Sequence, residues 1–297
     1  MVGDSAVVPE DRNAASSGPV RGRTRPRGQQ AAWRSAPLFG VAALFAVFLG
    51  LPVVALIART VLDGSFIRIA GSPAVLTALA LSLGTTAVSL ILTVAIGLPL
   101  AVLLARHTFR GKWLIEAIVD LPIVLPPAVA GLALLLVFGR RGFLAGPLQA
   151  AGLDIAFTTI AVILAQTFVS APFFVRSARA GLANVDRDLE DAARVDGASE
   201  RQLFRRITVP LAAGALAAGV VMSWARSLGE FGATIMFAGN VEGRTQTLPL
   251  VVYAHFQAGD LDASIAAAAI LVIAALGVLI AVRVFRWGRV LDVRSVG

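Results

Sequence analysis

The sequence predicts an all-α membrane protein with six transmembrane helices and one structured cytosolic loop, and three observations support this fold class. Of its 297 residues, 57% are hydrophobic and 15% are charged, whereas a soluble domain carries about 25% charged residues. The apolar residues form separate runs, each long enough for the roughly 20 residues that a bilayer-spanning helix requires. The basic residues gather between alternate runs, as they do in a chain that crosses a membrane repeatedly.

The N-terminal segment, residues 1–36, holds no apolar run and is rich in Arg, Pro, Gly and Ser. Such a composition buries too little apolar surface to fold alone, so we expect a disordered, Arg-rich cytosolic tail. The next stretch, about 38–62, is longer than the apolar core of a secretory signal peptide and lacks a convincing cleavage site. It is therefore predicted to be the first transmembrane helix.

Five further apolar runs follow, and some exceed the length that a perpendicular crossing needs, which predicts tilted helices or helices that extend beyond the lipid. They cover about 75–105, 117–138, 156–176, 208–237 and 263–285. With the first run they make a six-helix transmembrane domain over residues 37–288, and a cytosolic C-terminal tail follows at 289–297.

The basic residues orient these helices. If the N-terminus is cytosolic, the inside segments hold 20 of the 26 Lys and Arg residues. The outside segments hold only Arg68, Arg140, Arg141 and Arg244. Because positively charged loops stay in the cytosol, both termini are predicted on the cytoplasmic side of the cell membrane. The basic residues form no patch interleaved with aromatic side chains, which argues against nucleic acid as a partner.

Three prolines, Pro122, Pro126 and Pro127, stand near the cytosolic start of the third run. Proline removes a backbone donor, and an interrupted membrane helix is tolerated where neighbours or a cavity satisfy the freed carbonyl groups. The prolines therefore predict an interruption of the third span, and a simple kink is the alternative.

The loop at residues 179–206 is too structured for a mere connector. Helix-forming residues occupy 186–195, Gly197 permits a left-handed turn, Ser199 can cap a following helix, and Pro210 removes a backbone donor where the fifth span begins. The sequence thus predicts two short helices that meet at Gly197. In the first helix we expect the apolar side chains to pack and the charged ones to point elsewhere. The apolar set is Leu189, Ala192, Ala193 and Val195, and the charged set is Asp188, Glu190, Asp191 and Arg194.

A polar stripe marks the fifth span, because its members recur at intervals of three or four and share one helix face. The stripe comprises Ser223, Arg226, Ser227, Glu230 and Thr234. Charged residues in a membrane usually face a bundle interior or a water-filled path. Alternatively, Arg226 and Glu230 only neutralise each other and hold the packing. Arg226 lies about 19 residues beyond Ile207, nearly the hydrocarbon thickness at roughly 1.5 Å per residue, which predicts a position near the outer end.

The loop spacing resembles the cytosolic loop motif of ATP-binding-cassette importer permeases. That motif reads Glu-Ala-Ala, three residues, Gly, nine residues, Ile, one residue, Leu-Pro. Asp191 stands here in place of Glu, with Glu190 just before it, and Val209 replaces Leu. The remaining matching positions are Ala192, Ala193, Gly197, Ile207 and Pro210.

Longer strings, spread over about residues 38–285, are similar to the molybdate-type permeases, and sulfate permeases carry a related version. They are DLPIVLPPAVAG at 120–131, LAQTFVSAPFFV at 164–175, ARSLGEFGATIMFAGN at 225–240 and GRTQTLPLVVY at 243–253. The resemblance implies a type I ABC importer permease that imports molybdate, with tungstate and sulfate as alternatives.

The resemblance also implies partners and site residues. The chain would form a homodimer with two cytosolic ATPase subunits and an extracytoplasmic molybdate-binding protein, and the 179–206 loop would dock into the ATPase. The chain would be a non-catalytic subunit without a cofactor or metal of its own, whereas the ATPase would use ATP and Mg; no phosphate-binding loop is found in the sequence. The third and fifth spans would line the translocation path. The residues concerned are Pro122, Pro126, Pro127, Gly131, Ser223, Arg226, Ser227 and Glu230.

Two other classes remain as alternatives. An ion-coupled transporter that uses Asp120, Arg226 and Glu230 would require uptake without ATP and sensitivity to an ion gradient. An intramembrane enzyme would require a catalytic dyad or a metal cluster at membrane depth, and the sequence suggests neither. His107 and His255 fall on opposite sides of the predicted membrane.

Overall fold

The computed structural model describes the backbone of residues 29–294 and the side chains of residues 38–280. Most of the predicted N-terminal tail, residues 1–28, and the last three residues lie outside the described part of the chain. The chain divides into two units, Met1–Leu51 and Pro52–Gly297. The described part of the first unit is helical, since α1 extends over Gln29–Leu62 and continues into the second unit.

Helix α1 begins at Gln29, upstream of the predicted boundary at residue 37. Glutamine and alanine at positions 29–32 are good helix formers, so the helix continues into the predicted tail. Within the first unit, the large apolar side chains from Leu38 to Leu51 are exposed. A helix that is apolar and unburied over this length suits contact with lipid or with another chain.

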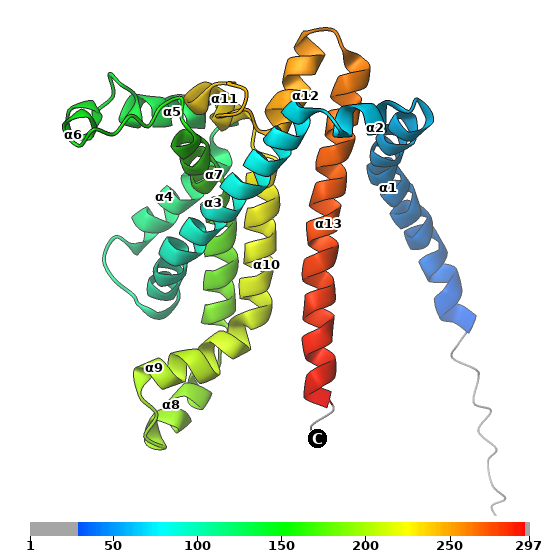
Figure 1. The fold of residues 1–297 in the computed structure, drawn as a ribbon. Helices are drawn as coiled ribbons and strands as arrows, with labels where there is room; N and C mark the ends of the chain where they lie inside the picture. Colours follow the sequence, from blue (N-terminus) through cyan, green and yellow to red (C-terminus); the bar gives the residue numbers. More distant parts are fainter. Residues whose placement is uncertain (1–28, 295–297) are drawn as a thin grey trace, which may run out of the picture. The chain divides into compact units, whose positions relative to one another are not determined.

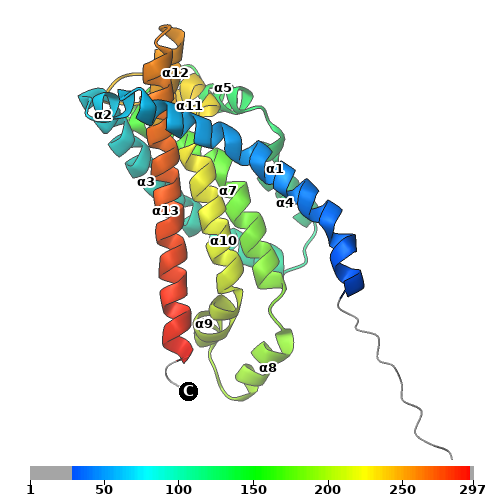
Figure 2. The same ribbon diagram turned by 90° about the vertical axis from the view of Figure 1, so that its right-hand side faces the viewer.

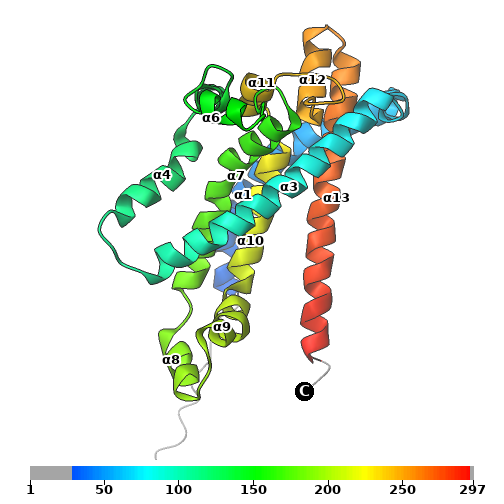
Figure 3. The same cartoon turned by 60° about the vertical axis from the view of Figure 1, so that its left-hand side comes forward.

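Three long helices form the centre of the second unit: α3 (Pro73–Arg106), α7 (Thr159–Ala183) and α10 (Val209–Leu228). Each of the three contacts the other two, and α3 crosses the other pair at a steep angle (Figure 3). Helix α13 (Leu261–Arg294) lies beside α10 (Figure 2). It passes the predicted boundary at residue 288, because residues 289–294 contain neither Gly nor Pro to end a helix.

Small residues allow these helices to approach closely. A Cβ atom on Gly97 of α3 would lie 3.0 Å from Cδ1 of Phe174 on α7. A Cβ atom on Gly181 of α7 would overlap the Cβ atom of Ala215 on α10. Close backbone approach through small residues is the usual way in which membrane helices associate, because lipid provides no hydrophobic drive between them.

Buried hydroxyl groups on α3 join the same three helices. Thr167 Oγ1 on α7 lies 3.1 Å from Ser89 Oγ, and Ser227 Oγ on α10 lies 3.4 Å from the same atom. Gln166 Nε2 donates to Thr86 Oγ1 at 3.4 Å. The sequence reasoning missed this polar seam, although its α3 members stand at the intervals of three or four that place residues on one helix face. They are Ser82, Thr86, Ser89 and Thr93.

The third predicted span is interrupted, as the prolines indicated, but by a break and not a kink. Helix α4 (Lys112–Val124) and helix α5 (Pro127–Phe138) meet at an angle of 119°. Pro126 is the N-cap of α5 and Pro127 is its first residue, whereas Pro122 is accommodated inside α4. Proline suits the first turn of a helix because its missing N–H would have no partner there.

The fifth span is entered through a continuous helical segment. Helix α9 (Glu200–Leu203) passes into a π-helix, η1 (Phe204–Thr208), and then into α10. The Val209 N–H donates to the Phe204 carbonyl, five residues back. Pro210, without an N–H of its own, follows directly, so the wider π turn stands where one α-helical hydrogen bond is missing.

The C-terminal part of the fifth span corrects the prediction of one helix over 208–237. Helix α10 ends at Leu228, and a separate helix, α11 (Gly232–Ala238), follows. The buried carboxylate of Glu230 accepts a hydrogen bond from the Ala233 N–H at 2.8 Å. It therefore satisfies a donor at the start of α11, as a capping side chain does.

The remaining helices are short: α2 (Ser65–Ala70), α6 (Ala145–Ala150), α8 (Arg187–Val195) and α12 (Leu248–Gln257). Helices α8 and α9 lie at one end of α10, whereas α5, α11 and α12 lie at the other (Figure 1). Five helices in the described residues are long and apolar enough to cross a membrane, or six if α4 and α5 make one broken span. The all-α membrane fold is thus confirmed.

Candidate functional site

The loop between α7 and α10 folds into the two predicted helices. Asp186 caps α8 by accepting the Asp188 N–H at 3.0 Å. The helix ends at Val195, and Gly197, two residues later, has a φ of +85°. The Gly197 N–H donates to Arg194 O at 3.0 Å and the Ala198 N–H donates to Ala193 O at 2.9 Å, which is the Schellman arrangement. Ser199 and Gln202 form a capping box at the start of α9.

Helix α8 buries a charged side chain and exposes apolar ones, the opposite of the expectation from its sequence. Glu190 is only 5% exposed, whereas Leu189 is 51% exposed and Val195 is 87% exposed. The carboxylate finds charged and hydroxyl partners inside the protein, and these compensate its loss of hydration. The apolar side chains of α8 are therefore left on the outer surface together with Asp191, whose side chain is 68% exposed.

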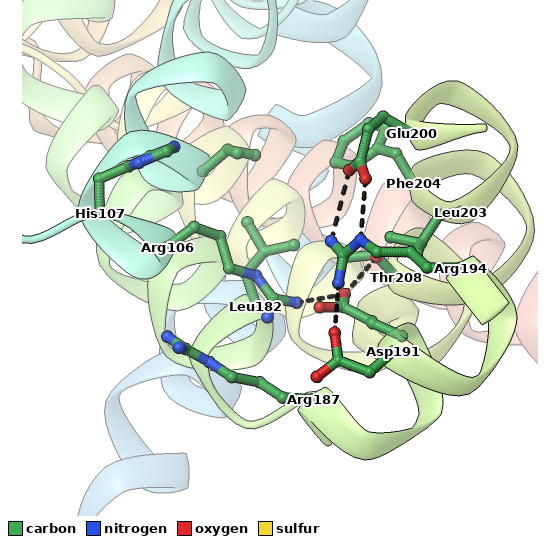
Figure 4. Close-up of a pocket in the computed structure, with 12 residues that line it drawn as sticks. Arg106, His107, Leu182, Arg187, Asp191, Arg194, Glu200, Leu203, Phe204 and Thr208 are labelled. Carbon is green, nitrogen blue, oxygen red and sulfur yellow. Dashed lines mark hydrogen bonds and ion pairs between the residues drawn. The ribbon is translucent and has the colours of Figure 1, made fainter. Parts of the chain in front are cut away.

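The carboxylate of Glu190 connects α8 to the end of α3 and to the end of η1. Its Oε1 atom lies 2.7 Å from Nη2 of Arg106, the last residue of α3. The same oxygen accepts a hydrogen bond from Thr208 Oγ1, the last residue of η1, at 2.5 Å. Figure 4 shows Arg106 and Thr208 converging on this point.

A cavity of about 390 Å³ adjoins this junction. Arg194, which also lines the cavity, forms a second set of ion pairs there. Arg194 Nη1 lies 2.6 Å from Asp191 Oδ1, and Arg194 Nε lies 2.8 Å from Glu200 Oε1 (Figure 4). The hydrogen bonds to Glu200 and then to Asp191 raise the pKa of the Arg194 guanidinium above its usual value. Arg194 therefore stays charged and ties α8 to α9 across the turn at Gly197.

The two stretches predicted to line a path meet at the opposite end of the second unit. A Cβ atom on Gly131 of α5 would lie 2.5 Å from the carbonyl oxygen of Ala233 on α11. A Cβ atom on Gly232 of α11 would lie 2.7 Å from the Cβ atom of Pro127 on α5. Glycine at both positions lets the backbones of α5 and α11 touch.

The charged pair of the fifth span lies beside this crossing. Arg226 Nη1 and Glu230 Oε2 are 2.6 Å apart, and Glu230 is 1% exposed whereas Arg226 is partly exposed. The pair has the features of the packing alternative: its charges neutralise each other, and the carboxylate also fixes the start of α11. The guanidinium is the member of the pair that reaches a surface of the chain.

The other members of the stripe point into the protein. Ser223 Oγ donates to the Ser170 carbonyl of α7 at 3.0 Å, and Ser227 contacts Ser89 of α3. Thr234 is fully buried on α11. Pro122 is buried, whereas Pro126 is exposed. The path role of all these residues stays a prediction.

Two further ion pairs attach α4 to α7. Asp120 Oδ1 lies 3.5 Å from Arg176 Nε, and Glu116 Oε1 lies 3.0 Å from Arg179 Nη2. Asp120 is thus the partner of an arginine.

The threonines of the GRTQTLPLVVY stretch lie inside the protein. Thr245 and Thr247 are buried, and Thr245 Oγ1 accepts the Val241 N–H at 2.9 Å. The Leu248 N–H, which opens α12, donates to Ser82 Oγ of α3 at 2.7 Å. This stretch therefore fixes α12 onto α3, while Arg244 is exposed on the turn before it.

The family described as "Binding-protein-dependent transport system inner membrane component" matches residues 97–292, more than half of the chain. This protein belongs to that family. It is accordingly a multi-pass membrane component of a transport system, in agreement with its apolar helices. The matched residues include the α8–α9 loop, the α5–α11 crossing and the Arg226–Glu230 pair.

Curated relatives of this permease cover most of its length. It is 42% identical over 236 residues to the molybdenum transport system permease protein ModB of Mycobacterium tuberculosis, covering 80% of this chain and 89% of that one. It is 36% identical over 220 residues to the sulfate transport system permease protein CysT of Salmonella typhimurium, covering 73% and 79%.

The fold also matches that of a solved importer. A chain of a bacterial ABC transporter involved in the import of the acidic polysaccharide alginate superposes with a TM-score of 0.68. The superposition covers 88% of this permease and 98% of that chain, at 18% sequence identity. At this identity the likeness establishes the fold of an ABC importer permease.

Proposed function

We propose that this chain is the membrane-spanning permease subunit of an ABC importer that moves molybdate into the cytoplasm. The observation that carries the proposal is the 42% identity to a molybdenum transport permease over 80% of the chain. Identity of this extent spans both candidate regions, the α8–α9 loop and the α5–α11 crossing.

The subunit works as a homodimer with two cytosolic ATPase subunits and an extracytoplasmic molybdate-binding protein, and both of its termini are cytoplasmic. The ATPase uses ATP and Mg, and the chain itself binds no cofactor. The outward face of α8, with Leu189, Val195 and Asp191, supports a docking role because exposed apolar side chains beside a charge are typical of an interface. Gly197, Ile207 and Pro210 connect this face to the fifth span.

The translocation path passes the α5–α11 crossing. Arg226 presents a guanidinium there, and a tetrahedral dianion is bound well by such a planar donor. Glu230 neutralises most of that charge at 2.6 Å, so the anion is held weakly and released, as conduction requires. Selectivity then resides mainly in the external binding protein.

Uptake into vesicles tests the proposal. The chain is reconstituted with its cognate ATPase and binding protein, and molybdate, tungstate and sulfate are compared with and without ATP. We expect ATP-dependent uptake of molybdate that excess sulfate does not inhibit. Uptake that proceeds without ATP and follows an ion gradient would instead establish a secondary transporter.

Sulfate is the second candidate substrate, because the chain is also 36% identical to a sulfate permease. Sulfate and molybdate are both tetrahedral dianions, so the Arg226 site attracts either one. Competition with the matched binding protein separates them: inhibition by sulfate at equal concentration favours the sulfate assignment.

Gly197→Val should uncouple ATP hydrolysis from uptake. The turn requires φ of +85°, which costs a non-glycine residue about 1–2 kcal/mol, and relief of this strain changes the angle between α8 and α9. We expect several-fold lower uptake per ATP hydrolysed, with normal insertion into the membrane. Gly111→Val is the matched control, since Gly111 also has a positive φ and open space around it but lies outside the loop. Equal uptake per ATP for Gly197→Val and the unmodified chain would remove the coupling role.

A further inference from the structure

The Glu190 junction joins helix ends that are far apart in the sequence. Glu190 belongs to α8, Arg106 ends α3, and Thr208 ends η1. One carboxylate oxygen accepts hydrogen bonds from both partners, at 2.7 Å and 2.5 Å. Glu190 is 5% exposed, so water cannot readily replace either partner.

A buried charge pair of this kind is rigid. The carboxylate has lost its hydration, so separating it from Arg106 would leave a buried charge without its partner. The side chains of Glu190, Arg106 and Thr208 should therefore stay together when α8 is displaced. A displacement of α8 must carry the end of α3 and the base of α10 with it.

Helix α3 carries such a displacement to the opposite end of the protein. It is continuous over 34 residues. Its Ser89 contacts Thr167 of α7 and Ser227 of α10 halfway along, and its Ser82 holds the first N–H of α12. Figure 3 shows α3 passing across α7 and α10 on its way from its Arg106 end toward α12.

We propose that Arg106 and Glu190 are positioning residues that clamp α8 to α3. Movement of the α8–α9 loop then reaches the membrane through α3 as well as through α10. The inference rests on the proposed function, because it assumes that α8 receives the ATPase. It assigns different roles to neighbouring acids: Glu190 is an internal strut, and Asp191 faces the partner.

The first test measures the number of ATP molecules hydrolysed per molybdate transported by the reconstituted complex. Glu190→Gln and Arg106→Gln should each raise this ratio about fivefold, because α8 then moves without α3. Thr208→Val removes only one hydroxyl and preserves packing, and it should raise the ratio to a smaller extent. Asp154→Asn is the matched control: it breaks the exposed pair with Arg140 and should leave the ratio unchanged.

The second test separates a clamp from a general structural role. The chain contains no cysteine, so Arg106→Cys/Glu190→Cys supplies the only two thiols of the purified permease. A short bifunctional thiol reagent, applied before assembly with the ATPase, should return the ratio toward that of the unmodified chain. A monofunctional reagent of the same chemistry should not.

An unchanged ratio in the folded single variants, or equal ratios with the two reagents, would overturn the clamp. Failure of the proposed function has a different signature. In that case the unmodified complex itself shows no ATP-dependent uptake of molybdate, tungstate or sulfate.

Discussion

Arg226→Gln should abolish most uptake and also destabilise the protein. It leaves the Glu230 carboxylate, 1% exposed, without its partner at 2.6 Å. Removing one member of a buried ion pair costs about 3–5 kcal/mol, since the remaining charge is uncompensated. We expect a lower melting temperature of the purified protein, measured as the loss of its size-exclusion peak after heating. Uptake should be at least about tenfold slower.

The double variant Arg226→Gln/Glu230→Gln separates the two roles of the pair. Glutamine at position 230 keeps an oxygen that can accept the Ala233 N–H, and no charge is then buried. Stability should recover to within about 1.5 kcal/mol, whereas uptake should stay low because the guanidinium is absent. Normal uptake by this variant would show that the pair only holds the helices together.

Gly131→Val should prevent α5 and α11 from packing. A Cβ atom at this position would lie 2.5 Å from Ala233 O and 2.8 Å from Ala233 Cα. Both are backbone atoms that cannot rotate away, so the helices must separate. Overpacking commonly costs about 1–3 kcal/mol and more where the backbone must shift, and we expect the upper end of this range with loss of uptake.

Gly84→Ala is the control for Gly131→Val. Gly84 also lies within a membrane helix, but a Cβ atom there meets nothing within 4 Å. Alanine should be neutral or stabilising by up to about 1 kcal/mol, because glycine is the poorer helix former. If Gly131→Val melts at the temperature of Gly84→Ala, the two helices are not in the close contact described.

Local signals in the sequence were sufficient for several features of the site. Gly197 and Ser199 predicted the turn between α8 and α9 because backbone sterics and capping act over a few residues. Pro126 and Pro127 predicted the interruption of the third span for the same reason. Gly229 was a comparable signal for the end of α10, and it was overlooked beside the apolar run that surrounds it.

Contacts between distant residues were not predictable in this way. The amphipathic pattern of α8 indicated that its apolar side chains would pack, but the structure buries Glu190 and exposes Leu189. The reason is Arg106, which lies 84 residues away in the sequence. Likewise, Ser227 shares a face with Arg226 in the sequence pattern, yet it meets Ser89, 138 residues away, inside the helix bundle.

Residence in a membrane, the approximate regions of the apolar helices and the two-helix loop follow from the sequence alone, because composition, periodicity and backbone sterics are local properties. Only the tertiary structure decided which distant residues meet: the polar groups of Glu190, Arg106 and Thr208, and the backbones at Gly131 and Ala233. In an apolar environment a buried polar group takes whichever partner the crossing helices bring to it. That choice depends on the arrangement of all the helices in the bundle.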